Sequence, residues 1–397
     1  MPHARAGIPR RTLFRRAFAI IALLAAAAGC QSEPPPAPAP APVVLSWQEV
    51  SLPSPPAGYV NAVRAVTYCS GHWYATGAWT APAAEPRPAA WSSPDGRTWT
   101  ALTAQPDTYY GRRNVLYAAA CRGDRLVAIG ARSGGAHGNP RISTWYQAGA
   151  RMVEVEARPY TMFGGENAVN TSRIAAGAAG WMLTGNRVSG AAAWFSATGE
   201  RFGIIERAPG LASADGTETY ASDVIALGSG WLLVGARTPP GGSREPAAWF
   251  SHDGLAWKLQ PAPGDPSYEE LQRVVERGDT LVAAGPRGQG YGVWSRPVDR
   301  PDAGWAFDGS FGRVDGTIPG SVTSLVDTGA GLLTVVRNGL RYEIWQSGQS
   351  RANWEAVALP ASGPEGPDGI VTAAAGVDLL VVVVDDGRGA RLFARMP

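Results

Sequence analysis

The chain has 397 residues, with 35 basic and 33 acidic side chains and a formal net charge of +2. Five of the arginines lie in the first 29 residues, which hold no acidic residue, so the rest of the chain carries 30 basic and 33 acidic side chains, a balance of −3. This mildly acidic balance argues against nucleic acid as a partner. The 50 glycines and 33 prolines predict many tight turns and few long helices.

The first 29 residues have the three zones of an export signal. A basic segment with paired arginines (10–11 and 15–16) precedes an apolar run over 17–28, and small residues follow it. The run is too short for a permanent transmembrane helix, which needs about 20 apolar residues. We therefore predict cleavage and export. The paired arginines are compatible with both the general secretory and the twin-arginine route.

The signal ends in Ala27-Ala28-Gly29-Cys30, which resembles the bacterial lipobox, although that motif prefers leucine where Ala27 stands. The resemblance implies lipidation of Cys30 and attachment to the membrane of the cell envelope, outside the cytoplasm. The alternative is an ordinary secretory signal that leaves Cys30 unmodified. Residues 30–44 form a Pro-Ala segment expected to stay extended as a tether.

From residue 45 to residue 397 the sequence repeats about every fifty residues. A tryptophan that follows small apolar residues marks six units, at Trp91, Trp145, Trp194, Trp249, Trp294 and Trp345. A short apolar strand precedes each of them and occurs a seventh time at 379–383. Four short strands per repeat of this length predict an all-β fold, a β-propeller with seven four-stranded blades.

The two ends of the repeat region complement each other. The seventh repeat has only three strands before the chain stops, and residues 45–53 read as an isolated fourth strand. Pairing this N-terminal strand with residues 391–396 would close the ring and cover two open sheet edges. We expect a monomer.

A turn motif follows the tryptophan strand in several repeats. Its clearest copies run from Ser93 to Trp99 and from Ser251 to Trp257. Serine and aspartate side chains accept backbone N–H groups across such a turn, and glycine adopts a positive φ. The motif residues are Ser93, Asp95, Gly96 and Trp99, then Ser251, Asp253, Gly254 and Trp257. A degenerate third copy spans 196–202.

These turns resemble the Asp-box of sialidase-like β-propellers, Ser-x-Asp-x-Gly-x-Thr-Trp, with one residue fewer. The resemblance implies a structural role for the motif, on the face opposite an active site. A sialidase would also need an Arg-Ile-Pro motif near the first blade, and the nearest match, Pro140-Arg141-Ile142-Ser143, lacks the final proline and falls in the second repeat.

Arginine recurs two residues after the glycine that ends the second strand of a repeat. The set is Arg132, Arg187, Arg237, Arg287 and, in the same register, Arg337. The connections that open on the same face of a propeller carry aromatic residues, including Tyr110, Tyr220 and Tyr268. Guanidinium groups beside aromatic rings suit carboxylate- or sugar-bearing ligands. The alternative is that each arginine stacks on the tryptophan of its own blade.

Other chemistry has little support in the sequence. His72, His137 and His252 are not spaced as metal ligands, no cofactor motif is present, and no catalytic residue can be assigned. Asp385-Asp386-Gly387 reads as an ordinary turn, with calcium binding as the alternative. Cys69 and Cys121 end the first strands of neighbouring repeats, where they can form a disulfide or remain buried thiols.

The sequence therefore predicts an envelope-tethered propeller that binds a glycan, peptide or protein through its Arg/aromatic face. One alternative is a glycan-acting hydrolase or lyase that uses acidic residues of the same loops. The candidates for that role are Asp107, Glu166, Glu218 and Glu269. Another alternative is an envelope assembly factor with a wide protein interface.

Overall fold

The computed structural model describes residues 40–134, 140–300, 302–315 and 319–396. The expected signal segment and the lipidation site at Cys30 lie outside these residues. Contacts divide the chain into a short unit up to Pro40 and a second unit, Ala41–Pro397, to which every strand named below belongs. No helix in the described part of the chain is long and apolar enough to span a membrane.

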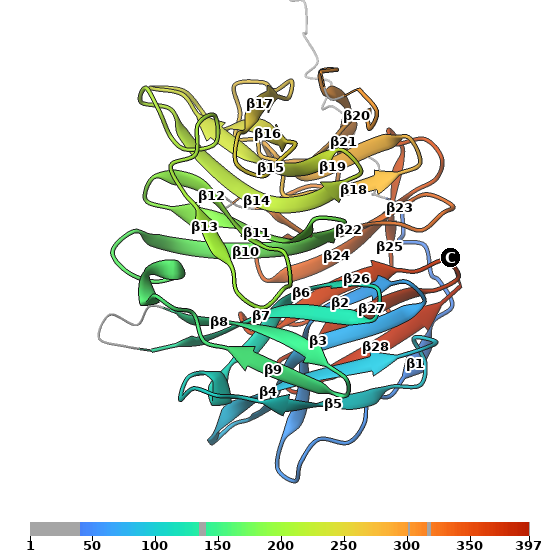
Figure 1. The fold of residues 1–397 in the computed structure, drawn as a ribbon. Coiled ribbons are helices and arrows are strands. Elements are labelled where there is room, and N and C mark those ends of the chain that lie inside the picture. The colour runs from blue at the N-terminus through green and yellow to red at the C-terminus, as the bar shows by residue number, and fades with distance from the viewer. Residues whose placement is uncertain (1–39, 135–139, 301, 316–318, 397) are drawn as a thin grey trace, which may run out of the picture. The chain divides into compact units, whose positions relative to one another are not determined.

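The described residues form an all-β fold (Figure 1), as predicted. Its strands group into seven four-stranded blades of antiparallel strands. Blade 1 contains β2 (Val60–Cys69), β3 (His72–Ala81), β4 (Ala84–Ser93) and β5 (Thr100–Gln105). Blade 2 contains β6 (Val115–Arg122), β7 (Arg125–Ser133), β8 (Pro140–Ala148) and β9 (Arg151–Val155). Blade 3 contains β10 (Ala168–Gly177), β11 (Gly180–Arg187), β12 (Gly190–Ser196) and β13 (Gly203–Ile205).

The next three blades repeat this order. Blade 4 contains β14 (Glu218–Leu227), β15 (Gly230–Thr238), β16 (Glu245–Ser251) and β17 (Lys258–Pro261). Blade 5 contains β18 (Arg273–Arg277), β19 (Thr280–Arg287), β20 (Gly290–Pro297) and β21 (Ala306–Phe311). Blade 6 contains β22 (Ser321–Asp327), β23 (Leu332–Asn338), β24 (Arg341–Ser347) and β25 (Trp354–Val357). Two 3-10 turns, η1 (Gly111–Arg113) and η2 (Tyr160–Met162), precede blades 2 and 3.

Blade 7 combines both ends of the repeat region. It contains β26 (Ile370–Ala375), β27 (Leu380–Asp385), β28 (Ala390–Arg395) and the N-terminal strand β1 (Gln48–Val50). β1 pairs with β28 in the predicted place, with Gln48 opposite Ala394 and Val50 opposite Leu392. The fourth strand of the last blade thus comes from the other end of the sequence.

The core is divided among the blade interfaces. Seven clusters of buried side chains each join two neighbouring blades, including blade 7 with blade 1. The marker residues Trp91, Trp145, Trp194, Trp249 and Trp294 have no exposed surface and lie in these clusters. The first strands of successive blades lie beside each other, with β2 beside β26. Burial of one large aromatic ring per repeat therefore explains the fifty-residue period.

Two features differ from the expected pattern. β5 and β9, the outer strands of blades 1 and 2, pair in parallel and join these blades into one eight-stranded sheet. The segment expected to form a tether, 30–44, is also paired with the fold near its C-terminal end, because Val43 forms a β-bridge with Val357. The Val43 N–H donates to the carbonyl of Ala356 at 2.8 Å. Unlike the prolines before it, valine has the N–H and the branched side chain that favour strand pairing.

Candidate functional site

The five arginines of the predicted binding face are already engaged within the fold. Arg132 pairs with Glu85 of blade 1 at 2.8 Å, and Arg187, which is almost fully buried, pairs with Glu206 at 2.9 Å. Arg237 pairs with Glu245 at 2.9 Å, and Arg287 pairs with Asp265 and Glu269 at 2.7 and 2.5 Å. Arg337 donates to the carbonyl of Gly339 and lies over the Tyr342 ring. The structure does not gather these arginines into one site.

Two of the predicted tyrosines lie around an arginine outside that set. The Arg244 guanidinium lies over the rings of Tyr220 and Tyr268, at 5.0 and 5.4 Å from their centroids. Arg244 also pairs with the buried Glu270 at 2.8 Å. Burial and the Glu270 charge raise the pKa of Tyr268 to about 12. Since its charge is neutralised, this arginine is a structural group rather than an open site.

The four acidic residues considered for catalysis come from four separate segments, three connections and the start of β14. Glu269 is fully buried and paired with Arg287, and burial raises its pKa. Asp107, Glu166 and Glu218 are exposed. Among the described residues no hydrogen bond joins any two of the four, and Glu269 is engaged in a structural ion pair.

The Asp-box turns have the geometry expected of a structural motif. Asp95 Oδ1 accepts the N–H groups of Arg97 and Thr98 at 2.8 and 2.7 Å and the Ser93 hydroxyl at 2.9 Å. Asp253 makes the same contacts in blade 4, and Gly96 and Gly254 both have positive φ. The turns follow the C-terminal ends of the third strands. Arg141, by contrast, is near the start of β8, the third strand of blade 2, and so lies at the other end of its strand from the position of such a turn.

The hydrogen bonds to Asp95 predict an acid-dependent loss of stability. Backbone donors at Thr98 and Arg97 lower its pKa from 3.8 to about 2, so its ionised form favours the folded state. That contribution is complete above pH 4 and is lost as the pH falls toward 2. Asp95→Asn should cost about 1 kcal/mol at pH 7, a small effect because the turn is solvated.

Urea unfolding at pH 7 and at pH 3 measures this effect. The difference in unfolding free energy between wild type and Asp95→Asn should be smaller at pH 3 than at pH 7. Asp378 is an exposed aspartate between β26 and β27, and Asp378→Asn serves as the control variant. An unchanged difference at the two pH values would show that the turn does not depend on the carboxylate.

Cys69 and Cys121 form a disulfide between the first strands of blades 1 and 2, one of the two outcomes that the sequence allowed. Asp385 connects blade 7 to blade 1, because its carboxylate accepts the Val63 N–H at 3.0 Å and pairs with Arg64. This aspartate is therefore a structural residue. Within the described ranges, no three His, Cys, Asp or Glu side chains are placed to hold a metal ion.

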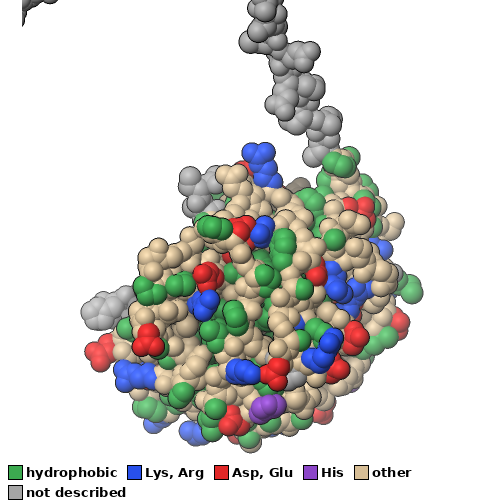
Figure 2. All heavy atoms as spheres, turned by 90° about the horizontal axis from the view of Figure 1, so that it is seen from above, with side chains coloured by type: hydrophobic (Ala, Val, Ile, Leu, Met, Phe, Trp, Pro, Cys, Tyr) green, Lys and Arg blue, Asp and Glu red, His purple; other side chains and the backbone are tan. Residues whose placement is uncertain are grey.

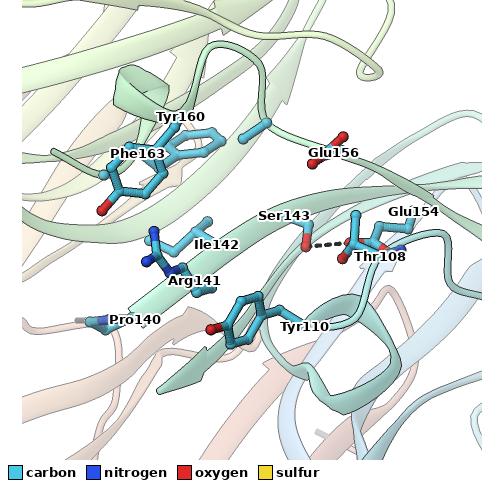
Figure 3. A pocket seen from close by; sticks show the side chains of 12 residues that line it. Thr108, Tyr110, Pro140, Arg141, Ile142, Ser143, Glu154, Glu156, Tyr160 and Phe163 are labelled. Carbon is cyan, nitrogen blue, oxygen red and sulfur yellow. Dashed lines mark hydrogen bonds between the residues drawn. The ribbon is translucent and has the colours of Figure 1, made fainter. Parts of the chain in front are cut away.

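A pocket of about 210 Å³ lies where blade 2 meets blade 3 (Figure 3). It is formed by the loop before β6, the start of β8 and the connection from β9 to β10. Tyr110, Arg141 and Tyr160 line its mouth, and the buried Phe163 lies on the side of blade 3. The pocket therefore combines one cation and three aromatic rings with two carboxylates, Glu154 and Glu156.

Arg141 is held between two tyrosine rings. Its guanidinium carbon lies 4.5 Å from the Tyr160 ring centroid and 5.6 Å from that of Tyr110. Among the described residues it has no acidic partner, and its Nε is buried without a hydrogen bond. Stacking fixes the plane of the guanidinium and leaves its N–H donors along the edge of that plane.

The buried carboxylate of Glu154 holds one of the loops that form this pocket. Glu154 accepts four hydrogen bonds: from the N–H groups of Asp107 and Thr108 at 2.7 and 2.8 Å, and from the hydroxyls of Thr108 and Ser143 at 2.7 and 2.8 Å. It fixes the loop that leads to Tyr110. That loop packs so closely that a Cβ on Gly111 would lie 1.8 Å from the Glu154 carboxylate.

The neighbouring surface of blades 1 and 2 adds further cations on aromatic rings. Arg87 lies over Tyr59 at 4.6 Å, and Arg113 lies over Tyr109 at 3.8 Å. Neither arginine forms an ion pair with a described residue. On the face seen in Figure 2, by contrast, basic and acidic side chains are interspersed. Arg87 and Arg113 thus add two cations without an acidic partner among the described residues.

Sequence reasoning identified Tyr110 and missed the role of Arg141, which in the sequence belongs only to an incomplete Arg-Ile-Pro motif. A second register does exist: arginine stands four residues before the marker tryptophan in three repeats, as Arg87, Arg141 and Arg341. These three arginines are on the third strand of their blades, whereas the arginines of the predicted set are on the second strand.

No protein-family description matches the sequence, and no curated protein resembles it significantly. Among solved structures, YCF48 bound to a D1 peptide is similar, with 12% identity and a TM-score of 0.54 over 91% of this chain and 100% of that one. A protein from Lactobacillus plantarum is 11% identical, with a TM-score of 0.50 over 79% and 92% of the two chains. A Hadza microbial sialidase is 12% identical, with a TM-score of 0.46 over 85% and 66%. At these identities the likeness establishes the fold: the chain is a β-propeller, and sialidases are among the structures that resemble it.

Proposed function

We propose that this propeller is a binding module that takes a carboxylate-bearing ligand in the pocket around Arg141. The observation that carries the proposal is the arginine itself, which lies stacked between Tyr110 and Tyr160 without an acidic partner in the described chain. All five arginines of the face predicted from the sequence have partners. We therefore place the site at Arg141, on the third strand of blade 2. The predicted chemistry, arginine beside aromatic rings, is retained.

The geometry favours a carboxylate over other groups. A guanidinium offers parallel N–H donors that match the two oxygens of a carboxylate. The rings of Tyr110, Tyr160 and Phe163 supply flat apolar surface for the rest of a ligand, such as a sugar ring or an amino-acid side chain. Arg87 on β4 and Arg113 in η1 extend the positive potential, which favours ligands with more than one acidic group.

Binding explains the pocket better than catalysis does. Glu154 has both oxygens occupied by hydrogen bonds, and Glu156 pairs with Arg158 at 2.6 Å. The Ser143 hydroxyl donates to Glu154. The described carboxylates of the pocket are thus engaged in structural contacts. With the tether expected from the N-terminal sequence, the module would present this pocket at the outer side of a bacterial membrane.

A screen of matched acids and amides tests the proposal. The purified protein is mixed with uronic acids and their amides, and with short peptides that end in a free carboxylate or in an amide. We expect acids to raise the unfolding temperature and their amides to have a much smaller effect, because only acids form a charge-assisted pair worth about 1.5–3 kcal/mol. Equal shifts from acids and amides, or no shift from any acid, would contradict it.

A further inference from the structure

A second group of charges lies at the centre of the ring, away from the Arg141 pocket. The first strands of five blades each carry an irregularity in their pairing with the second strand. It falls between Val63 and Ala65, Leu116 and Ala118, Thr171 and Arg173, Ala221 and Asp223, and Val322 and Ser324. Such irregularities change the direction of side chains. Because these strands line the ring, the affected positions place polar groups toward its axis.

Two arginines from different blades meet there. Arg173 Nη2 and Arg273 Nε both donate to the carbonyl oxygen of Thr323, at 3.2 and 3.0 Å. Arg173 is on blade 3 and Thr323 is on blade 6, so in a ring of seven blades the Arg173 side chain crosses the axis. Two guanidinium groups that share one acceptor oxygen lie close enough to repel each other.

One nearby carboxylate, Asp223, interacts electrostatically with both arginines but offers a single negative charge against two positive charges. Asp223 accepts the N–H groups of Val224 and Val274 at 2.9 and 3.2 Å, and it forms no ion pair with either arginine among the described contacts. Burial and the neighbouring Arg173 lower the pKa of Arg273 to about 9. Arg64, on the first strand of blade 1, pairs with Asp385 of β27, so that pair is neutral by itself. The centre thus carries one excess positive charge.

The three side chains are deep in the ring but not sealed. Arg173, Arg273 and Asp223 each keep part of their surface accessible to water. A small anion can therefore reach them, and in these low-dielectric surroundings its pairing with two guanidiniums would be stronger than at an open surface.

We propose that Arg173 and Arg273 form a binding site at the ring axis for one small monovalent anion, a carboxylate or a halide. The site is separate from the Arg141 pocket and does not depend on the function proposed for it. One bound anion brings the net charge of the cluster to zero and connects blades 3 and 5, which are not neighbours. The anion would therefore stabilise the closed ring.

Unfolding temperatures in sodium formate and in sodium chloride, each over a range of concentrations, test this site. With increasing concentration of one or both salts, the unfolding temperature of wild type should rise more steeply than the unfolding temperature of Arg273→Gln. The apparent affinity of the variant should be at least about tenfold weaker, the effect of one charge-assisted contact. The salt with the steeper rise identifies the anion as a carboxylate or a halide.

Two further variants complete the test. Arg132→Gln removes an arginine paired near the blade 1–2 border and should keep the wild-type dependence in both salts. Asp223→Asn removes a negative charge from the cluster and should therefore bind the anion more tightly. This increase in affinity can be measured even if Arg273→Gln does not fold. The proposal fails if wild type and Arg273→Gln depend equally on both salts, or if Asp223→Asn binds formate and chloride no more tightly than wild type.

Discussion

Deletion of residues 45–53 is expected to destabilise the protein by on the order of 4 kcal/mol or to prevent its folding. The deletion removes β1 and leaves the edge of β28 without its partner. It also removes Val50, which is buried with Leu392 between blades 7 and 1, and Trp47, which packs between blades 6 and 7. The salt bridge between Glu49 and Arg391, at 2.6 Å, is lost as well.

Urea unfolding and size-exclusion chromatography measure the effect of this deletion. We expect a large fall in the unfolding midpoint and, because an exposed strand edge pairs with other chains, aggregation. Deletion of residues 33–39 in the Pro-Ala segment is the matched control and should leave the midpoint unchanged. Equal midpoints for the two deletions would mean that the N-terminal strand does not close the ring.

Glu154→Ala should be the most damaging single substitution near the candidate site, at about 3 kcal/mol. It removes an acceptor of four hydrogen bonds and leaves two partly buried backbone N–H groups without their partner. The loop that carries Tyr110 should loosen, and the affinity for carboxylates at Arg141 should fall together with stability. Glu154 acts through the loop and is a positioning residue.

Glu156→Ala provides the control for this prediction. Glu156 follows the same strand, but its side chain is 41% exposed and pairs only with Arg158. Its loss should change stability by less than about 0.5 kcal/mol, as is usual for surface positions. Unfolding free energies and acid binding of both variants decide the matter. Similar losses for the two substitutions would show that Glu154 does not support the loop.

The sequence predicted the parts of the fold that repeat. Five of the seven blades bury a marker tryptophan against a neighbour, so residues such as Trp145 and Trp249 mark the period directly. The closing strand could be predicted because a seventh repeat with three strands needs a partner for its open edge. The turn motif could be predicted because its hydrogen bonds, such as those of Asp95, are local in sequence.

The sites were harder to predict because they combine side chains from different blades. Tyr110, Arg141 and Tyr160 come from three segments, and no local pattern shows that their rings and guanidinium stack. The axial cluster depends on strand irregularities, which an alternating pattern of apolar and polar residues does not reveal. The visible arginine register, from Arg132 to Arg337, repeats with the blades, but the partners of these arginines differ from blade to blade.

Arg141 is expected to bind the carboxylate of a ligand, and calorimetric titration with the best acid from the screen measures this binding. Wild type, Arg141→Gln and Arg132→Gln are compared, the last being an arginine already paired with Glu85. We predict that Arg141→Gln binds the acid at least about tenfold more weakly, the loss of one charge-assisted contact. Arg132→Gln should bind like wild type, and both variants should stay folded. Binding of the acid by Arg141→Gln with wild-type affinity would contradict this expectation.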